Sequence, residues 1–499
     1  MSPAIIGITI LGYFGVLFGI ALFTSRNAGN DAYFLGNRKS PWFAVAFGMI
    51  GDSLSGVTFI SLPGTVEGSK FSYMQMVLGY FLGYFLIARV LLPLYYKLNL
   101  TSIYGYLLER FGRGAQMTGS FYFLISRLIG AALRLYLAAA VLQLFLFDHY
   151  NIPFPLTVAI IILLMLLYTY RGGIKTLVWT DTLQSALLLG GVVLSITAIL
   201  SQLDWSLGKA ISEIQQSEMS TMFFWDWQEK SFFPKQFLSG AFIAVVMTGL
   251  DQNMMQKSLS CPDLRSAQKN LYWFSVVLVF VNLLFVSLGA LLYIYSAQAG
   301  IQLTVNAETQ KVITDQVFPF LALNQLGIFA SVIFIIGLTA ATFSSADSVL
   351  TTLTTSFCLD FLRTNDQVKY NEKKRTRVRV MVHISFAVLL LLTIMASELL
   401  PKTAVIDLIF TTAAYTYGPL LGLFVFGLFT KMRTRDHLVP VISLVSVGCT
   451  FLLNYFSVEI LGGYKFGYEL LLVNGMITFC GLAIFSSSPQ RLENSNVNS

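Results

Sequence analysis

Long apolar stretches separated by short polar segments run along almost the whole chain. Each stretch is about 20 residues or longer, the length at which a helix crosses a hydrocarbon core of roughly 30 Å. The pattern therefore predicts an all-α polytopic membrane protein in which residues 1–499 form one transmembrane domain. About thirteen transmembrane helices are expected, at residues 3–24, 41–66, 71–97, 116–148, 152–171, 174–200, 235–258, 271–298, 329–360, 378–399, 403–430, 437–457 and 467–485.

Composition agrees with a lipid environment. Charged residues make up 11% of the 499 residues and hydrophobic residues 56%, with a mean hydropathy of +0.70. So few charges could not cover the surface of soluble domains of this length, and the lipid bilayer is the expected surrounding. The first apolar stretch lacks a basic n-region and an A-x-A cleavage site, so we expect a retained helix rather than a signal peptide.

Basic residues are concentrated in alternate loops of the predicted topology. The richest segment runs from Arg363 to Arg379, and Lys257, Arg265 and Lys269 fall on the same side. The positive-inside rule places that side in the cytoplasm, which with thirteen helices gives an extracellular N-terminus and a cytoplasmic C-terminus. This topology accounts for the net charge of +7, so no nucleic-acid partner is expected. A short chain without a tail favours a bacterial inner membrane.

Two predicted helices carry a glycine and an acid near the middle of the span. They are Gly51-Asp52-Ser53-Leu54-Ser55-Gly56 in helix 41–66 and Thr248-Gly249-Leu250-Asp251-Gln252-Asn253 in helix 235–258. Lipid-facing helices tolerate such residues poorly. Broken helices at corresponding places of two halves are typical of secondary transporters with inverted repeats. The alternative is a pair of kinks with serines bonded back to the backbone.

The spacing of these breaks defines the expected repeats. They lie five spans apart, and an odd number of spans per repeat gives the two halves opposite orientations. We therefore expect inverted repeats at about 41–200 and 235–430, with the helices at 3–24, 437–457 and 467–485 as additions. Helix 329–360 adds hydroxyls at Ser344 and Ser345, oxygen ligands of the kind that hard cations prefer. A close helix contact is the alternative reading of this hydroxyl-rich helix.

At these residues the sequence resembles the sodium:solute symporter family, which includes bacterial galactose and sialic acid symporters. The resemblance covers nearly the whole chain, in several separate motifs in the right order. It implies the five-plus-five inverted-repeat fold of the bacterial leucine transporter type. Besides the first broken helix, the motifs are Asp31-Ala-Tyr-Phe-Leu-Gly36, Gly172-Gly-Ile174, Trp179-Thr-Asp-Thr-Leu-Gln184, Phe343-Ser-Ser345 and Gly418-Pro-Leu-Leu-Gly422.

The resemblance implies a sodium site. Its ligands would be the backbone carbonyls of Gly51, Leu54 and Ala341 and the hydroxyls of Ser344 and Ser345. Asp181, in the Trp-Thr-Asp motif, looks like the family's aspartate near the ion exit path, where some members hold a second sodium. A structural role for Asp181, bonded to neighbouring hydroxyls, is an equal alternative.

The resemblance also suggests where the solute contacts the chain. The segment after the first break would line its site, with Ser55, Gly56, Val57 and Thr58 as candidates. Galactose-type members have an acid and an amide at positions 57 and 58, so a galactose-like hydroxyl network is doubtful here, and the segment looks closer to the sialic acid branch.

That branch clamps a carboxylate with an arginine, and Gly130 stands at its position. Arg127 and Arg134 share a helix face with Gly130. Arg134 could meet an acidic solute or pair with Asp52, Asp251 or Asp347.

Asp251 and Gln252 at the second break are further candidates for solute contact. Asp52 and Asp251 could instead bind a cationic group on the solute, so the sign of the substrate stays open.

The sequence thus predicts sodium-coupled symport of a small polar organic solute into the cell by alternating access. Sialic acid, another sugar or a carboxylate-like compound would suit. No enzyme is expected, because no nucleophile, base or metal set is held together in the spans. A proton-coupled symporter and a solute channel or transporter-like sensor remain the alternatives. The pattern leaves the sodium stoichiometry and the oligomeric state open.

Overall fold

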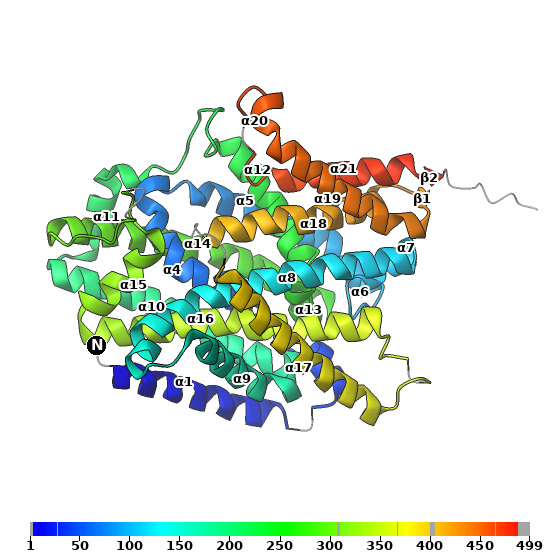
Figure 1. Cartoon of the computed structure of the whole chain (residues 1–499), viewed down its shortest axis with the longest axis horizontal. Coiled ribbons are helices and arrows are strands. Elements are labelled where there is room, and N and C mark those ends of the chain that lie inside the picture. The colour runs from blue at the N-terminus through cyan, green and yellow to red at the C-terminus, as the bar shows by residue number, and fades with distance from the viewer. Residues whose placement is uncertain are drawn as a thin grey trace, which may run out of the picture.

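The computed structural model describes residues 3–26, 28–306, 310–366, 368–399, 405–464 and 466–487, and these residues are almost entirely helical. The long helices lie side by side along the long axis of the molecule (Figure 1). Within the described residues, the strands are the short antiparallel pair β1 (Arg433–Thr434) and β2 (Ser486–Ser487). The expected all-α class is confirmed.

Two of the predicted spans are bent. Helices α3 (Trp42–Ser53) and α4 (Gly56–Ser69) meet at 58°, and the helix Phe233–Gly249 meets α13 (Gln252–Leu259) at 64°. Both breaks fall at the glycine and acid motifs.

The other helices follow the predicted spans closely, with short helices added in the loops. They are α1 (Pro3–Thr24), α2 (Asn30–Leu35), α5 (Tyr73–Leu86), α6 (Leu92–Lys97), α7 (Gly105–Arg110), α8 (Arg113–Leu142), α9 (Phe154–Gly172), α10 (Ile174–Leu203), α11 (Leu207–Gln216), α12 (Phe233–Ala244), α14 (Leu264–Gln298), α15 (Thr314–Asn324), α16 (Gly327–Ser356), α17 (Glu372–Ser397), α18 (Val405–Phe429), α19 (Val439–Tyr455), α20 (Ser457–Ile460) and α21 (Leu470–Ile484). The predicted start of the helix at 403 lies outside the described residues.

The structure contains fewer clear membrane-spanning helices than the thirteen predicted. Among the described residues, nine helices are long and apolar enough to cross a membrane, or up to eleven if each bent pair is one span. Two shorter apolar helices, at Phe154–Tyr170 and Leu470–Ile484, occupy the expected positions 152–171 and 467–485. The count of thirteen therefore stays a prediction.

Small residues let the central helices approach closely. A Cβ on Gly191 of α10 would lie 3.3 Å from Gly337 Cα of α16, and a Cβ on Gly79 of α5 would lie 2.0 Å from the Phe237 carbonyl oxygen of α12. Such contacts are typical of helix pairs in membranes, where van der Waals packing replaces the hydrophobic effect. They bring α10 against α16 and α5 against α12, beside the two breaks.

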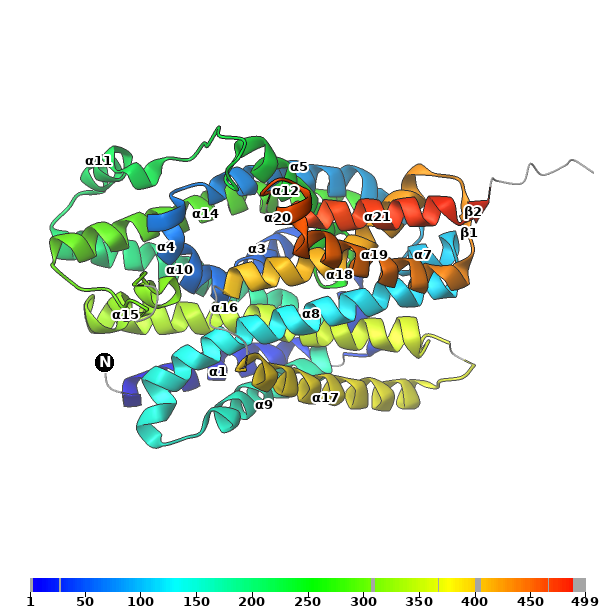
Figure 2. The ribbon, with the colours of Figure 1, turned by 45° about the horizontal axis from the view of Figure 1, so that its top comes forward.

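The first and last described segments of the chain lie at opposite ends of the molecule. Helix α1 starts at the end that carries α11, whereas β2 lies at the other end, with the segment that joins α16 to α17 (Figures 1 and 2). A chain arranged in this way crosses the membrane an odd number of times. Eleven spans and thirteen spans both meet this condition.

The predicted position of Lys257 was wrong. It was assigned to a loop, but it lies in α13 and its side chain is 1% exposed.

Candidate functional site

The first break frees backbone carbonyls near the centre of the molecule. In the last backbone hydrogen bond of α3, the Leu54 amide donates to the Ile50 carbonyl at 2.8 Å. Ser55 is extended, and α4 begins at Gly56. The carbonyls of residues 51–54 therefore lie between the last hydrogen bond of α3 and the first of α4, which the Ser55 carbonyl accepts, and are open to other partners. A Cβ on Gly56 would lie 2.4 Å from Thr342 Oγ1, so a larger residue could not approach α16 in this way.

The structure brings Gly51 against the hydroxyls of α16 and α10. A Cβ on Gly51 would lie 2.8 Å from Ser344 Oγ and 2.7 Å from Ser185 Oγ, and the Gly51 amide donates to Ser185 Oγ at 2.9 Å. Ser344 Oγ is buried and has no hydrogen-bond partner among the residues that the structure describes. A buried hydroxyl oxygen without a partner is costly unless something else binds it, and a cation held with the freed carbonyls would do so.

The remaining sodium candidates lie on the same two elements. Leu54 is in the break itself, and Ala341 and Ser345 are buried on α16. Ser345 Oγ donates to the Thr342 carbonyl at 3.1 Å, so its lone pairs stay free to face an ion. These positions fit a small hard cation, and the assignment of the five ligands stays a prediction.

A buried lysine links the two broken helices. Lys257 Nζ lies 2.5 Å from Asp52 Oδ2 of α3 and 2.5 Å from Asp181 Oδ2 of α10. Ser348 Oγ donates to the same oxygen of Asp181 at 3.3 Å, and Asn253 Nδ2 donates to Asp52 Oδ2 at 3.2 Å.

The sequence analysis missed this role of Lys257, although the predicted span 235–258 already contained the residue. A lysine inside a span was the signal, since intramembrane charges usually have partners there.

The second break is held by an ion pair. Arg127 Nε of α8 lies 2.5 Å from Asp251 Oδ2, and the Tyr417 hydroxyl of α18 donates to the same oxygen. Asp251 Oδ1 accepts the Met254 amide at 3.1 Å and caps α13. Asp251 is fully buried in these contacts and does not line the central cavity.

Gln252, the neighbouring candidate for solute contact, faces away from the cavity. Its side chain accepts the Ile103 amide at 2.9 Å and donates to the Thr101 carbonyl at 2.9 Å. It thereby joins α13 to the segment before α7.

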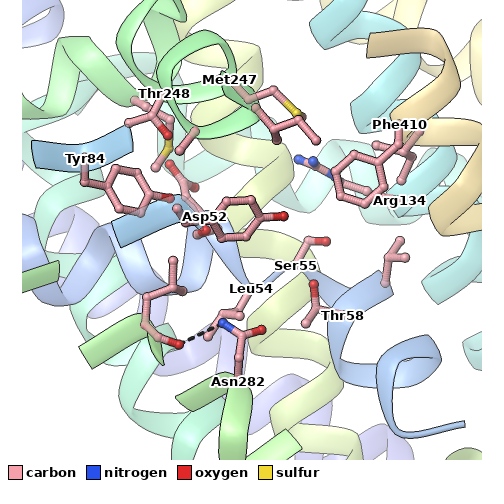
Figure 3. Close-up of a pocket in the computed structure, with 18 of the residues that line it drawn as sticks. Asp52, Leu54, Ser55, Thr58, Tyr84, Arg134, Met247, Thr248, Asn282 and Phe410 are labelled. Atoms are coloured by element: carbon pink, nitrogen blue, oxygen red, sulfur yellow. Dashed lines mark hydrogen bonds between the residues drawn. The ribbon is translucent and has the colours of Figure 1, made fainter. Parts of the chain in front are cut away.

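A central cavity of about 90 Å³ lies beside the first break, room for several waters or a small solute. Three predicted residues of the segment after the break line it, namely Ser55, Val57 and Thr58. Gly56 does not, because it packs on Thr342. Residues that were not predicted to contact the solute complete the wall, among them Tyr84, Thr248, Asn282 and Phe410 (Figure 3). Tyr73 and Tyr80 also line it.

Arg134 is the unpaired cation of this cavity. Its guanidinium points into the pocket beside Phe410 (Figure 3), and its Nε has no hydrogen-bond partner in the described part of the chain. None of the three acids considered as its partner holds it: Asp52 binds Lys257, Asp251 binds Arg127, and Asp347 accepts from the Tyr168 hydroxyl at 2.7 Å.

Gly130, one turn before Arg134, does not line the cavity. A Cβ on Gly130 would meet nothing within 4 Å, so the structure leaves open space at the position of the family's arginine.

Two helices broken near the centre of the molecule, around buried charges, freed carbonyls and a cavity with polar and charged residues in its wall, are typical of a secondary transporter. A family model described as the sodium:solute symporter family matches residues 33–437. The chain belongs to this family. It is accordingly a sodium-coupled symporter and not an enzyme, and sodium is its coupling ion.

Individual relatives agree over most of the chain. The sodium/sialic acid symporter SiaT of Proteus mirabilis (strain HI4320) is 23% identical over 465 residues, 91% of each chain. The sodium-coupled monocarboxylate transporter 1 of Mus musculus is 24% identical over 403 residues, 79% of this chain and 64% of that protein.

Solved structures show the same fold. A substrate-bound, outward-open Na⁺-coupled sialic acid symporter gives a TM-score of 0.81 at 22% identity, covering 96% of this chain and 97% of that one. Mhp1, a nucleobase-cation-symport-1 family transporter, gives 0.53 at 15% identity, covering 92% and 94%. The expected five-plus-five fold class is confirmed.

Proposed function

We propose that this symporter imports a small organic anion, a solute with a carboxylate, together with sodium. The observation that carries this proposal is Arg134, a partly buried cation that points into the central cavity and lacks an ion pair among the described residues. An anion bound there would supply the missing partner. The names of the relatives agree with this charge, since sialic acid and monocarboxylates are both acids.

The rest of the cavity suits a solute with hydroxyl or amide groups. The hydroxyls of Tyr73 and Tyr80 lie 3.5 Å apart, and Ser55, Thr58 and Asn282 add polar atoms to the wall. Such groups fix orientation in a mostly enclosed site. Ser55, Val57 and Thr58 contact the solute in this proposal, and Gly130 leaves room beside Arg134.

Sodium couples its own movement to that of the solute by bridging α3 and α16. The carbonyls of Gly51, Leu54 and Ala341 and the hydroxyls of Ser344 and Ser345 would hold it, next to the solute cavity that Leu54 also lines. Because these ligands belong to separate elements, the ion binds best when the elements are close together, and this difference between conformations produces coupling. The proposal places the N-terminus outside and the C-terminus in the cytoplasm of a bacterial inner membrane.

Uptake into proteoliposomes tests the proposal. A radiolabelled panel of sialic acid, lactate, pantothenate, a hexose and inositol is offered with an inward sodium gradient or with potassium in its place. One of the acids should accumulate above its equilibrium level in sodium alone, while hexose and inositol do not. Accumulation of an uncharged solute would contradict the role of Arg134, and passive entry without accumulation would favour a channel.

A further inference from the structure

An apolar groove on the outside of the transporter lies between α3 and α14. It has a volume of about 200 Å³, and aromatic and aliphatic side chains line it, among them Trp42, Phe43, Phe47, Ile50, Trp273 and Val277. Phe43 is 56% exposed and Trp273 is 54% exposed. In a helix that crosses a bilayer, such a groove faces hydrocarbon, so an apolar chain is the occupant that fits it.

Aromatic and basic residues mark one end of the groove. The rings of Trp42 and Trp273 have centroids 6.4 Å apart, and Lys269 Nζ lies 4.2 Å from the centre of the Trp42 ring. Trp42 is the first residue of α3. Tryptophan and lysine together are typical of the headgroup level of a membrane, where the indole sits at the interface and the ammonium reaches the polar layer.

The positive charge at this end is not neutralised by the protein. Lys269 and Arg265 lie one and two turns before Trp273 on α14, and both are exposed. Neither has an ion pair among the described residues. The nearby Asp263 accepts the Ser266 amide at 2.8 Å and caps α14. Lys39, also exposed, precedes Trp42 by three residues. An anion is therefore missing where the apolar groove ends.

We propose that this groove binds an anionic phospholipid. One acyl chain lies between α3 and α14, and the phosphate of the headgroup meets Lys269 and Arg265. An apolar chain joined to an anionic head matches both halves of the site, and clusters of basic side chains beside membrane-spanning helices are suited to such headgroups. A zwitterionic lipid would fill the groove but leave the basic residues without a net negative partner.

The position of the groove connects lipid binding to transport. Ile50 lines the groove, and Gly51 and Asp52 follow it directly at the broken end of α3. A bound acyl chain would support the helix that ends at the sodium site. Occupancy is expected to stabilise the folded carrier and to raise its transport rate.

Melting temperature in detergent measures the lipid preference directly. Purified full-length protein is titrated with phosphatidylglycerol or phosphatidylcholine of identical acyl chains, and with glycerol phosphate alone. Phosphatidylglycerol should raise the melting temperature by several degrees more than phosphatidylcholine, and glycerol phosphate should have no effect. Equal shifts by the two lipids, or a shift with glycerol phosphate alone, would overturn the proposal.

Matched variants separate this site from general surface charge. Arg265→Ala with Lys269→Ala should abolish the preference for phosphatidylglycerol. Lys373→Ala with Arg377→Ala removes the same charge from an exposed part of α17 and should leave the preference intact. Ala46→Leu, which adds bulk inside the groove, should weaken stabilisation by both lipids. If the control pair loses the preference as fully as the first pair, the effect is unspecific and the site is refuted.

Discussion

Ser344 combines complete burial with a hydroxyl that nothing in the described structure binds. Replacing Ser344 and Ser345 by alanine removes two oxygen ligands from the sodium site. Each ligand to a charged group contributes about 1.5 kcal/mol or more, so losing two should raise the sodium concentration for half-maximal uptake about a hundredfold. Ser356→Ala, a buried hydroxyl farther along α16, is the control. Unchanged sodium dependence of the double variant would refute the assignment.

Arg134 is expected to determine affinity for the anion rather than for sodium. Arg134→Met leaves a bound carboxylate unpaired inside the cavity, which costs about 2–5 kcal/mol and should raise the solute KM by a factor of about 30 or more. Arg134→Lys should recover part of this loss, because it keeps the charge without the planar fork. Sodium binding, measured by intrinsic fluorescence without solute, should change little. A loss of sodium binding would instead indicate a structural arginine.

Lys257 forms ion pairs with two acids at once. Lys257→Met leaves Asp52 and Asp181 buried together without their cation, a change of the kind that destabilises proteins by about 3–5 kcal/mol. The melting temperature should fall, and sodium should restore more of it than in the parent protein. Adding Asp181→Asn should recover stability by removing one of the two charges. If Lys257→Met alone were as stable as the parent protein, these ion pairs would not stabilise the fold.

These three residues show what sequence could and could not predict about the site. Local sequence indicated the break and the hydroxyl-rich helix, but only the family resemblance placed Gly51 and Ser344 in one site, and the two residues lie together. The partner of Arg127 could not be predicted, since Arg127 and Arg134 share one helix face and only packing against α13 separates them.

At the level of helices, the first break depends on close approach to α16. A Cβ on Gly56 would lie 2.4 Å from Thr342 Oγ1. Gly56→Ala should therefore push α4 away from α16 and lower sodium affinity and uptake together by about tenfold or more. Adding Thr342→Ala removes the clashing oxygen and should restore much of the loss. Gly190→Ala, where a Cβ meets nothing within 4 Å, is the control, and failure of the rescue would point to lost flexibility instead.

The helices in the loops were not predicted. Hydropathy shows the membrane spans because each is a long apolar run. By contrast, α11 and α15 are too short and too polar to stand out, and α15 is placed by contact with α4, where a Cβ on Gly64 would lie 1.9 Å from the Thr314 carbonyl oxygen. Such elements depend on tertiary contacts that no local window contains.

For the whole molecule, the end that carries the basic segment from Arg363 to Arg379 should face the cytoplasm. Helix α11 and the segment that joins α16 to α17 lie at opposite ends of the carrier (Figures 1 and 2). Lys209→Cys lies in α11, and Lys373→Cys lies in the first turn of α17. In a chain whose four native cysteines are replaced by serine, an impermeant maleimide should label position 209 in intact spheroplasts and position 373 only in inverted vesicles. The reverse pattern would invert the predicted topology.

The ion pair of Lys257 has a consequence for the return of the empty carrier. Solute and sodium leave, but this ammonium is covalently attached and stays beside Asp52 and Asp181. The unloaded protein thus keeps a cation in its interior while it resets, and resetting is the step that lets one molecule perform net uptake repeatedly. Without the lysine, loaded carriers could still exchange solute across the membrane. Counterflow in Lys257→Met should therefore survive better than net uptake, and equal losses of both would show that the lysine does not serve the empty carrier.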